Sequence, residues 1–325
     1  MIRVLTLILA LAGFGVQSLY GADQLPPLPE AVASFGAAVN DGNVYVYGGH
    51  VGQTHQHSCE NTTGAFWCLD ADRAIWQELP SGPALQGLAL VAHGESLIRL
   101  GGMYATNEPG EAEAMYSTDS VMRFDTLTRR WHDLPSLPSV RSSHDAVTIE
   151  DKVYVVGGWG MDSDGDVHWH DQGLVLDLNV DEPTWDRFDQ PFERRALSVA
   201  VHEGKLYAIG GLTSDDDISN EVNVYDPVTG CWSRAPDLPG GYMNGFGSSC
   251  WTQGGRLSVS CFDGKIYQRN SSGTAWDSHW TLAVPRYMHR VLAVERGDDS
   301  GVSEGAVALV LGGDSQSGHV RLTEV

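Results

Sequence analysis

An apolar run that ends in two glycines, Val44-Tyr-Val-Tyr-Gly-Gly49, decides the fold because the pattern returns along the whole chain. It recurs as Leu97-Ile-Arg-Leu-Gly-Gly102, Val153-Tyr-Val-Val-Gly-Gly158, Leu206-Tyr-Ala-Ile-Gly-Gly211 and Val307-Ala-Leu-Val-Leu-Gly-Gly313. The first four copies are separated by about 53 to 56 residues. The last gap is about twice as long, and a degenerate copy at Leu257–Phe262 fills it. Such a period predicts repeated units that share one continuous core.

Each unit continues with a second strand that ends in a polar residue and then a tryptophan. The strands are Phe66–Asp70, Val121–Asp125, Leu174–Asp177, Val222–Asp226 and Lys265–Asn270, followed by Trp76, Trp131, Trp185, Trp232 and Trp276. Ten positions after each tryptophan stand Gln86, Arg141, Arg195, Tyr242 and Arg286. This constant offset predicts the same connection from the outer strand of one unit to the inner strand of the next.

The repeated Gly-Gly, Tyr, Asp-ended strand, Trp and Arg together resemble the kelch family. The resemblance implies an all-β, six-bladed β-propeller over residues 22–325, with blades at about 33–80, 86–135, 140–189, 194–236, 242–282 and 286–325. The last unit lacks an outer strand, and Gln24-Leu-Pro-Pro-Leu-Pro-Glu30 echoes Asp133-Leu-Pro-Ser-Leu-Pro138. We therefore expect residues 24–30 to pair as a strand into the C-terminal blade and to close the ring.

The first residues differ from the rest of the chain. Arg3 precedes an apolar run from Val4 to Val16, and small residues follow at Gly21-Ala22. This pattern predicts a cleavable signal peptide over residues 1–21 and an exported, periplasmic or secreted protein without integral membrane association; an uncleaved N-terminal anchor is the alternative. The net charge of −22 argues against nucleic acid as a partner.

The kelch resemblance also implies where a ligand binds, because residues at the Arg position of such propellers line the channel mouth. Transferred here, the ligand-binding candidates are Gln86, Arg141, Arg195, Tyr242 and Arg286, joined by Tyr104 and Trp159 from the long loops. Three arginines at one opening would attract an anion; the alternative is that they only bond neighbouring loops. His144 and His289, each three positions beyond an arginine, are the candidate acid–base groups.

Two further residue sets follow from spacing. His55 with His57 and His168 with His170 form His-x-His pairs that could bind zinc or copper if their loops met, or could be exposed without a metal. In an exported chain, Cys59 with Cys68 and Cys250 with Cys261 are the candidate disulfides.

Three functions are compatible with these features. The first is a binding module for an anionic saccharide or an acidic protein segment at the channel mouth, with no cofactor. The second is a sugar isomerase, since the plan is similar to that of periplasmic kelch propellers that act as N-acetylneuraminate mutarotases or epimerases. The third is a structural or protein-interaction ring.

Overall fold

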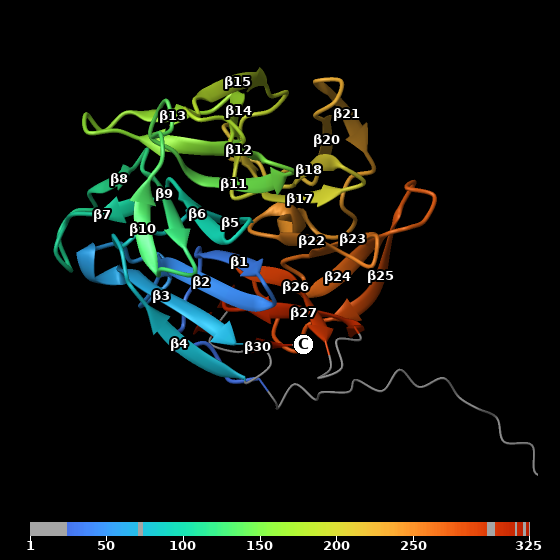
Figure 1. Cartoon of the computed structure of the whole chain (residues 1–325), viewed down its shortest axis with the longest axis horizontal. Helices are drawn as coiled ribbons and strands as arrows, with labels where there is room; N and C mark the ends of the chain where they lie inside the picture. The colour runs from blue at the N-terminus through green and yellow to red at the C-terminus, as the bar shows by residue number, and fades with distance from the viewer. Residues whose placement is uncertain (1–24, 71–73, 298–302, 316, 321–322, 325) are drawn as a thin grey trace, which may run out of the picture.

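The computed structural model describes residues 25–70, 74–297, 303–315, 317–320 and 323–324, and in them the chain folds into antiparallel sheets arranged radially around an axis (Figure 1). Helix is confined, among these residues, to two 3₁₀ turns, η2 (Cys59–Asn61) and η3 (Tyr242–Gly245). No helix in the described part of the chain is both long enough and apolar enough to cross a membrane. The architecture is an all-β propeller.

Five sheets are complete blades, each with four strands in radial order. Blade one contains β1 (Gly36–Asn40), β2 (Asn43–His50), β3 (Thr62–Asp70) and β4 (Ile75–Leu79). Blade two contains β5 (Ala89–His93), β6 (Ser96–Leu100), β9 (Val121–Asp125) and β10 (Arg130–Asp133). Blade three contains β11 (Ser142–Ile149), β12 (Lys152–Met161), β14 (Gln172–Asp177) and β15 (Trp185–Asp189), with β13 (Val167–Trp169) beside β12. Blade four contains β17 (Ser198–His202), β18 (Lys205–Ile209), β20 (Val222–Asp226) and β21 (Cys231–Ala235). Blade five contains β22 (Ser249–Gln253), β23 (Arg256–Ser260), β24 (Lys265–Arg269) and β25 (Trp276–Thr281).

The remaining radial sheet has three described strands, β26 (Arg290–Gly297), β27 (Ser303–Leu311) and β30 (Thr323–Glu324). Its inner strand β26 packs beside β22 on one side and β1 on the other. The described residues therefore form five four-stranded blades, which corrects the prediction of six.

The predicted closure by an N-terminal strand is also wrong for the part of it that is described, because residues 25–30 form no strand. The echoed segment 133–138 explains the error, since most of it lies after β10, in the linker between two blades. Residues 25–30 likewise form a linker, and Leu25 and Leu28 pack in one core cluster with Leu309 and Leu311. The signal peptide at 1–21 and Gln24 lie outside the described residues.

Backbone hydrogen bonds join the sheets around the axis. Six residues with left-handed φ values donate N–H to C=O in a closed ring, with N–O distances between 2.7 and 3.0 Å. The ring residues are Ser34, Gly87, Ser143, Ala196, Gly247 and Met288. The Ser34 N–H bonds to the Met288 carbonyl, so this bond connects the two ends of the described chain.

The core lies between neighbouring sheets. One cluster, for example, joins Ile209 and Val224 of blade four to Leu257 and Val259 of blade five. Tryptophan side chains add a polar link, because their Nε1 groups donate to a carbonyl of the preceding linker or, for Trp232, of the last residue of β15. The pairs are Trp76 with Pro26, Trp131 with Pro80, Trp185 with Pro135, Trp232 with Asp189 and Trp276 with Pro236.

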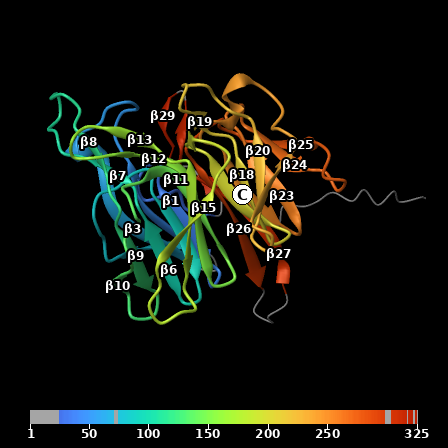
Figure 2. The ribbon, with the colours of Figure 1, turned by 90° about the horizontal axis from the view of Figure 1, so that it is seen from above.

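The Gly-Gly pairs let the chain leave the second strand of a blade close to its neighbour. At Gly49, φ is +116° and a Cβ atom would lie 2.2 Å from Val32 Cγ2, so a side chain is excluded. The segments after Gly-Gly form small sheets, β7 (Met103–Ala105) with β8 (Met115–Ser117), β16 (Arg194–Arg195) with β19 (Leu212–Thr213), and β28 (Asp314–Ser315) with β29 (Gly318–His319). Figure 2 shows β19 and β29 at the opposite face of the ring from the outer ends of β6, β10 and β27.

Candidate functional site at the channel mouth

A second layer of backbone pairs lies directly above the hydrogen-bonded ring and frames the channel mouth. In each pair, the residue before a ring residue faces the residue after a Gly-Gly. The pairs are Ala33 with His50, Gln86 with Met103, Ser142 with Trp159, Arg195 with Leu212, and Tyr287 with Asp314. Side chains of this layer are therefore the ones that can meet a ligand at the mouth.

Residues ten positions after a tryptophan are not structurally equivalent in all units. Arg141 and Arg286 stand two positions before their ring residues, Ser143 and Met288, whereas Arg195 stands only one position before Ala196. The equivalent of Arg141 and Arg286 is therefore Arg194, because the linker in blade three is one residue shorter. Tyr242 is displaced further, into η3, where it is 62% exposed.

Arg141 and Arg286 both bond to neighbouring backbone carbonyls, and Arg286 also lines a hollow at the mouth. Arg141 is 2% exposed and donates to the carbonyls of Gly157 and Gln172 at 3.3 and 3.1 Å. Arg286 is 1% exposed and donates to the carbonyls of Val284 and Gly312 at 3.1 and 3.2 Å. Burial lowers the pKa of Arg141 to about 9 and that of Arg286 to about 10. These contacts match the alternative, in which the arginines bond neighbouring loops, and convergence of all three arginines on one opening stays a prediction.

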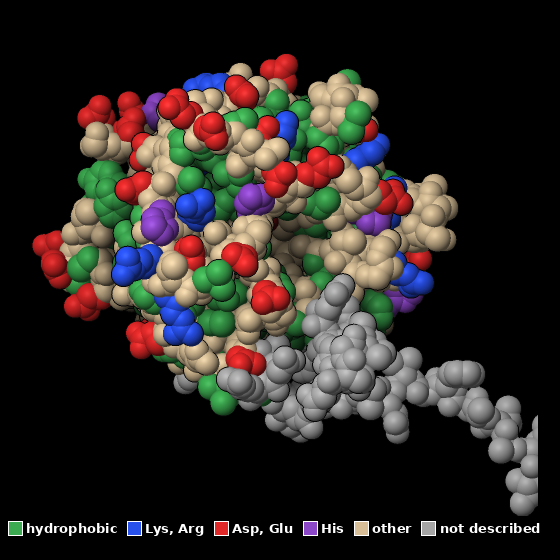
Figure 3. Space-filling view, in the orientation of Figure 1, with side chains coloured by type: hydrophobic (Ala, Val, Ile, Leu, Met, Phe, Trp, Pro, Cys, Tyr) green, Lys and Arg blue, Asp and Glu red, His purple; other side chains and the backbone are tan. Residues whose placement is uncertain are grey.

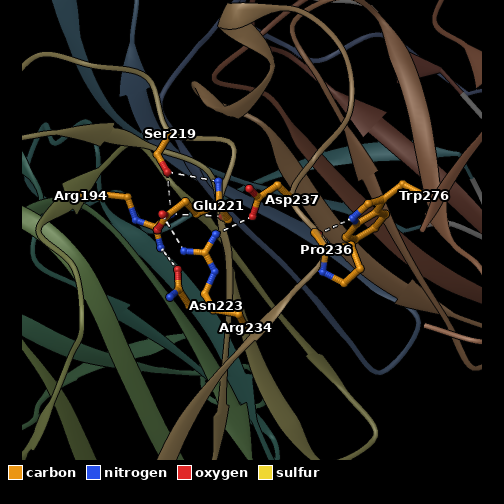
Figure 4. Close-up of polar contacts among 8 residues, drawn as sticks. All are labelled: Arg194, Ser219, Glu221, Asn223, Arg234, Pro236, Asp237 and Trp276. Carbon is orange, nitrogen blue, oxygen red and sulfur yellow. Dashed lines mark hydrogen bonds and ion pairs between the residues drawn. The ribbon is translucent and has the colours of Figure 1, made fainter. Parts of the chain in front are cut away.

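Arg194 repeats this scaffold role in blade four. Its Nη2 donates to Asn223 Oδ1 at 2.6 Å, and its Nη1 donates to Ser219 Oγ and the Glu221 carbonyl, both at 3.2 Å. Figure 4 shows these bonds beside a second group, in which Arg234 contacts both Glu221 and Asp237 at 2.6 Å. The first group ties the segment before blade four to β20 and the residues that precede it, and the second joins Glu221 to Asp237 of the linker between blades four and five.

Arg195 differs from the other arginines in the prediction. Its guanidinium carbon lies 4.1 Å from the ring centroid of Trp159 and 5.9 Å from that of Trp169. Within the described part of the chain its guanidinium has no hydrogen bond or ion pair, and its Nε atom is buried without a partner. Desolvation lowers its pKa, and nearby Asp216 opposes that shift. A cation held on an aromatic face with unused donors is suited to binding an anion.

An aromatic hollow of about 490 Å³ lies at the mouth, on the side that follows Arg195 in the order of the ring, and its lining includes Arg286 but not Arg195. Phe246 and Tyr287, which precede the next two ring residues, line it together with Phe262. The ring centroid of Tyr287 is 5.8 Å from Phe246 and 5.2 Å from Phe262. The volume suits a small organic ligand, and the ring faces suit the apolar faces of a sugar.

His144 and His289 line a small space together with the six ring residues and are 3% and 2% exposed. Each of the two histidines directly follows a ring residue. In other units the same position holds a buried apolar side chain, Phe35, Leu88 or Leu197, so this position serves packing between blades. Burial lowers the pKa of His289 to about 3 and moves that of His144 well below its usual value. Neither histidine is placed to exchange a proton with a ligand at the mouth, which corrects their candidate catalytic role.

A chain of polar side chains does occur at the mouth, between β2 and β29. His50 Nε2 donates to the Gln56 carbonyl at 2.8 Å, so its Nδ1 accepts from His319 Nε2 at 2.6 Å. His319 Nδ1 in turn faces Asp314 Oδ1 at 3.4 Å. Tyr287 Oη and Thr54 Oγ1 donate to the other oxygen of Asp314 at 3.1 and 2.8 Å. Burial lowers the pKa of His50 to about 4.

The predicted metal ligands do not form a metal site. Among the described residues, no three His, Cys, Asp or Glu side chains meet in a way that could hold an ion. His168 bonds to Asp162 at 3.0 Å, and His170 donates to the Val140 carbonyl at 3.0 Å. His57 contacts Gln86 at 3.3 Å, and His55 lines the aromatic hollow. The two His-x-His pairs are used separately, within their own loops.

The remaining predicted ligand-binding residues divide between the mouth and its outer wall. Gln86 is in the second layer but is 2% exposed and occupied by His57. Trp159 supports Arg195. Tyr104 is 37% exposed on β7, and its ring centroid lies 5.9 Å from that of Tyr116.

Comparison with known proteins agrees with this architecture. A family model described as "Kelch motif" matches residues 193–239. The structure titled "Structure of YjhT" superposes with a TM-score of 0.70 over 92% of this chain and 96% of that chain, at 16% sequence identity. The chain is a kelch-repeat β-propeller.

Curated relatives of this kelch propeller are longer proteins. Beta-scruin of Limulus polyphemus is 27% identical over 218 residues, which are 65% of this chain and 22% of that protein. Human kelch repeat and BTB domain-containing protein 13 is 37% identical over 158 residues, which are 48% of this chain and 32% of that protein. Kelch-like protein 35 of Mus musculus is 26% identical over 218 residues, covering 66% of this chain and 33% of that protein. The chain thus matches a third or less of each of these relatives.

Neither predicted disulfide forms in this kelch propeller, and all five cysteines are free. Cys250 on β22 pairs across the hairpin with Val259, so Cys261 is two positions beyond its partner. Cys59 is exposed on η2, whereas Cys68 is partly buried on β3.

Sequence reasoning missed Phe246, Phe262, Tyr287 and His319 as residues of the mouth. Tyr287 and Phe246 each directly precede a ring residue, and aligning the units on that residue would have identified them. Phe262 stands where the degenerate unit lacks its second glycine. No repeat pattern marks His319.

Proposed function

We propose that this propeller binds a small anionic saccharide at the channel mouth. Arg195 holds the anionic group, and Phe246, Phe262 and Tyr287 contact the faces of the sugar ring. The observation that supports this is the guanidinium of Arg195, which is stacked on Trp159 at 4.1 Å and has unused donors. In the order of the ring, Arg195 is followed by Phe246, which lines the hollow of about 490 Å³. Because acidic side chains are spread over the visible face in Figure 3, an unpaired cation at the mouth would give a local preference for anions.

Isothermal titration with glucuronate and N-acetylneuraminate, and with glucose as the neutral sugar, tests the proposal. We expect Arg195→Ala to weaken binding of the acids by at least about tenfold, since charge-assisted hydrogen bonds are lost. The matched control is Arg123→Ala, which removes an exposed arginine from β9 of blade two. Equal affinity of wild type and Arg195→Ala, or equal affinity for glucose and the acids, would contradict the proposal.

A sugar isomerase is the second candidate, and the polar chain at the mouth favours it. Tyr287 lines the hollow and donates to one oxygen of Asp314, whose other oxygen lies 3.4 Å from His319 Nδ1 without a hydrogen bond. Protonation of His319 would give this nitrogen a hydrogen to donate to Asp314 and would link Tyr287 to the His319–His50 pair. Anomer exchange of N-acetylneuraminate, followed by NMR with wild type and Asp314→Asn, tests this function. Exchange no faster than in buffer would exclude it without affecting the binding proposal.

A further inference from the structure

A second hollow lies on the hairpin-turn face, at the end of blades four and five opposite the mouth. In an antiparallel blade the turns β17–β18, β22–β23 and β24–β25 lie at the end away from the Gly-Gly segments. Residues of all three turns line a space of about 510 Å³. Its walls include two arginines, two histidines and a glutamine: His202, Arg256, Gln268, Arg269 and His279.

The two arginines are not neutralised by the protein. Arg256 Nη1 donates to Gln268 Oε1 at 3.1 Å. The guanidinium carbon of Arg269 lies 5.7 Å from the ring centroid of Tyr207, and its Nε atom is buried without a partner. No ion pair among the described residues joins either arginine to a carboxylate, although the chain is strongly acidic. Two guanidinium groups with unused donors therefore face one space.

His202 supplies a third polar group on the inner wall. It is 5% exposed, its ring centroid is 5.6 Å from that of Tyr207, and its Nδ1 atom is buried without a partner. A buried polar atom without a hydrogen bond is uncommon, because its lost hydration is not replaced. Desolvation and the charge of Arg269 lower the pKa of His202, whereas Glu203 opposes this shift. The neutral ring can donate or accept one bond to a ligand.

The rim of the space carries the opposite charge. Glu203 and Asp277 line it and are exposed. An inorganic anion would use the arginines and leave these carboxylates unpartnered. A ligand with an oxyanion at one end and hydroxyl groups at the other can satisfy both sets, because hydroxyls donate to carboxylates.

We propose that this pocket, named here the turn-face pocket, is a second binding site for a small hydroxylated oxyanion such as a sugar acid or a sugar phosphate. Arg256 and Arg269 bind the oxyanion, His202 adds a hydrogen bond, and Glu203 and Asp277 accept from hydroxyl groups. The site is independent of the mouth and does not require Arg195.

Isothermal titration of the Arg195→Ala protein tests the pocket without a contribution from the mouth. The probes are glucuronate, glucose 6-phosphate, glucose and inorganic phosphate, each used alone. We expect one molecule of glucuronate or of glucose 6-phosphate to bind per chain, and the acid that binds identifies the oxyanion as carboxylate or phosphate. Adding Arg256→Gln or Arg269→Gln should weaken that binding by at least about tenfold.

The matched control is Arg187→Gln, because Arg187 makes the same single bond as Arg256, to Gln172 Oε1 at 3.1 Å, but on blade three. The thermal unfolding midpoint of each variant checks that the fold is retained, and Arg269→Lys, which keeps the charge, should retain more affinity than Arg269→Gln. Absence of heat with both sugar anions, or tight binding of glucose or of inorganic phosphate alone, would overturn the proposal. Equal affinity of Arg256→Gln and Arg187→Gln would overturn it as well.

Discussion

Replacing Leu28 by alanine should destabilise the whole propeller, although Leu28 belongs to a segment without regular secondary structure. Leu28 is 1% exposed and lies in a cluster with Val44 of blade one and Val294 and Leu311 of the last sheet. Truncation of a fully buried leucine costs about 2–5 kcal/mol, because transfer free energy is lost and a cavity remains. The side chain is enclosed by two sheets, so we expect a loss of about 3 kcal/mol in the free energy of unfolding.

Urea unfolding followed by tryptophan fluorescence measures this loss. The control is Leu127→Ala, the same substitution at a side chain that is 72% exposed in the turn after β9; we expect it to cost less than about 0.5 kcal/mol. A loss below about 1 kcal/mol in Leu28→Ala would mean that residues 25–30 do not hold the last sheet against blade one.

Two more predictions concern the channel. Asp145→Asn should lower the free energy of unfolding by about 3 kcal/mol, because both Asp145 oxygens accept from Arg290 Nη1 at 3.0 and 3.1 Å and the partly buried arginine would lose its carboxylate partner. Urea unfolding should show a smaller loss in the double variant with Arg290→Gln. Stability should fall as pH drops below 6.5, because His289 has a pKa of about 3 in the folded protein and about 6.5 when unfolded, so only the unfolded chain takes up the proton in this interval. Urea unfolding at several pH values should give a slope in His289→Gln that is lower by about 1.4 kcal/mol per pH unit than in wild type, and equal slopes in the two proteins would contradict this assignment.

The sequence predicts the all-β repeat architecture well because Gly-Gly and Trp have local geometric roles. The first requires a left-handed backbone beside a neighbouring blade, and the second reaches a carbonyl of the preceding linker. The lengths of the linkers between blades are harder to predict from the sequence than the strands are. The one-residue difference that places Arg194 where Arg195 was expected changes which guanidinium is buried in the scaffold and which one stays free.

Contacts between distant segments could not be predicted from the repeats. The His50–His319 bond joins residues 269 positions apart, and neither histidine belongs to the periodic pattern. The echo of the Leu-Pro motif correctly indicated that the N-terminal segment meets the C-terminal sheet. It did not distinguish a strand from the linker that follows one, because the echoed segment itself lies mostly after β10.

The closed ring of backbone hydrogen bonds affects which substitutions the propeller can accept. Its bonds use only amide and carbonyl groups, and its members include serine, glycine, alanine and methionine. Substitutions among the side chains just above it leave every one of those amides and carbonyls in place, so new recognition can be acquired there while the closure of the circle is conserved.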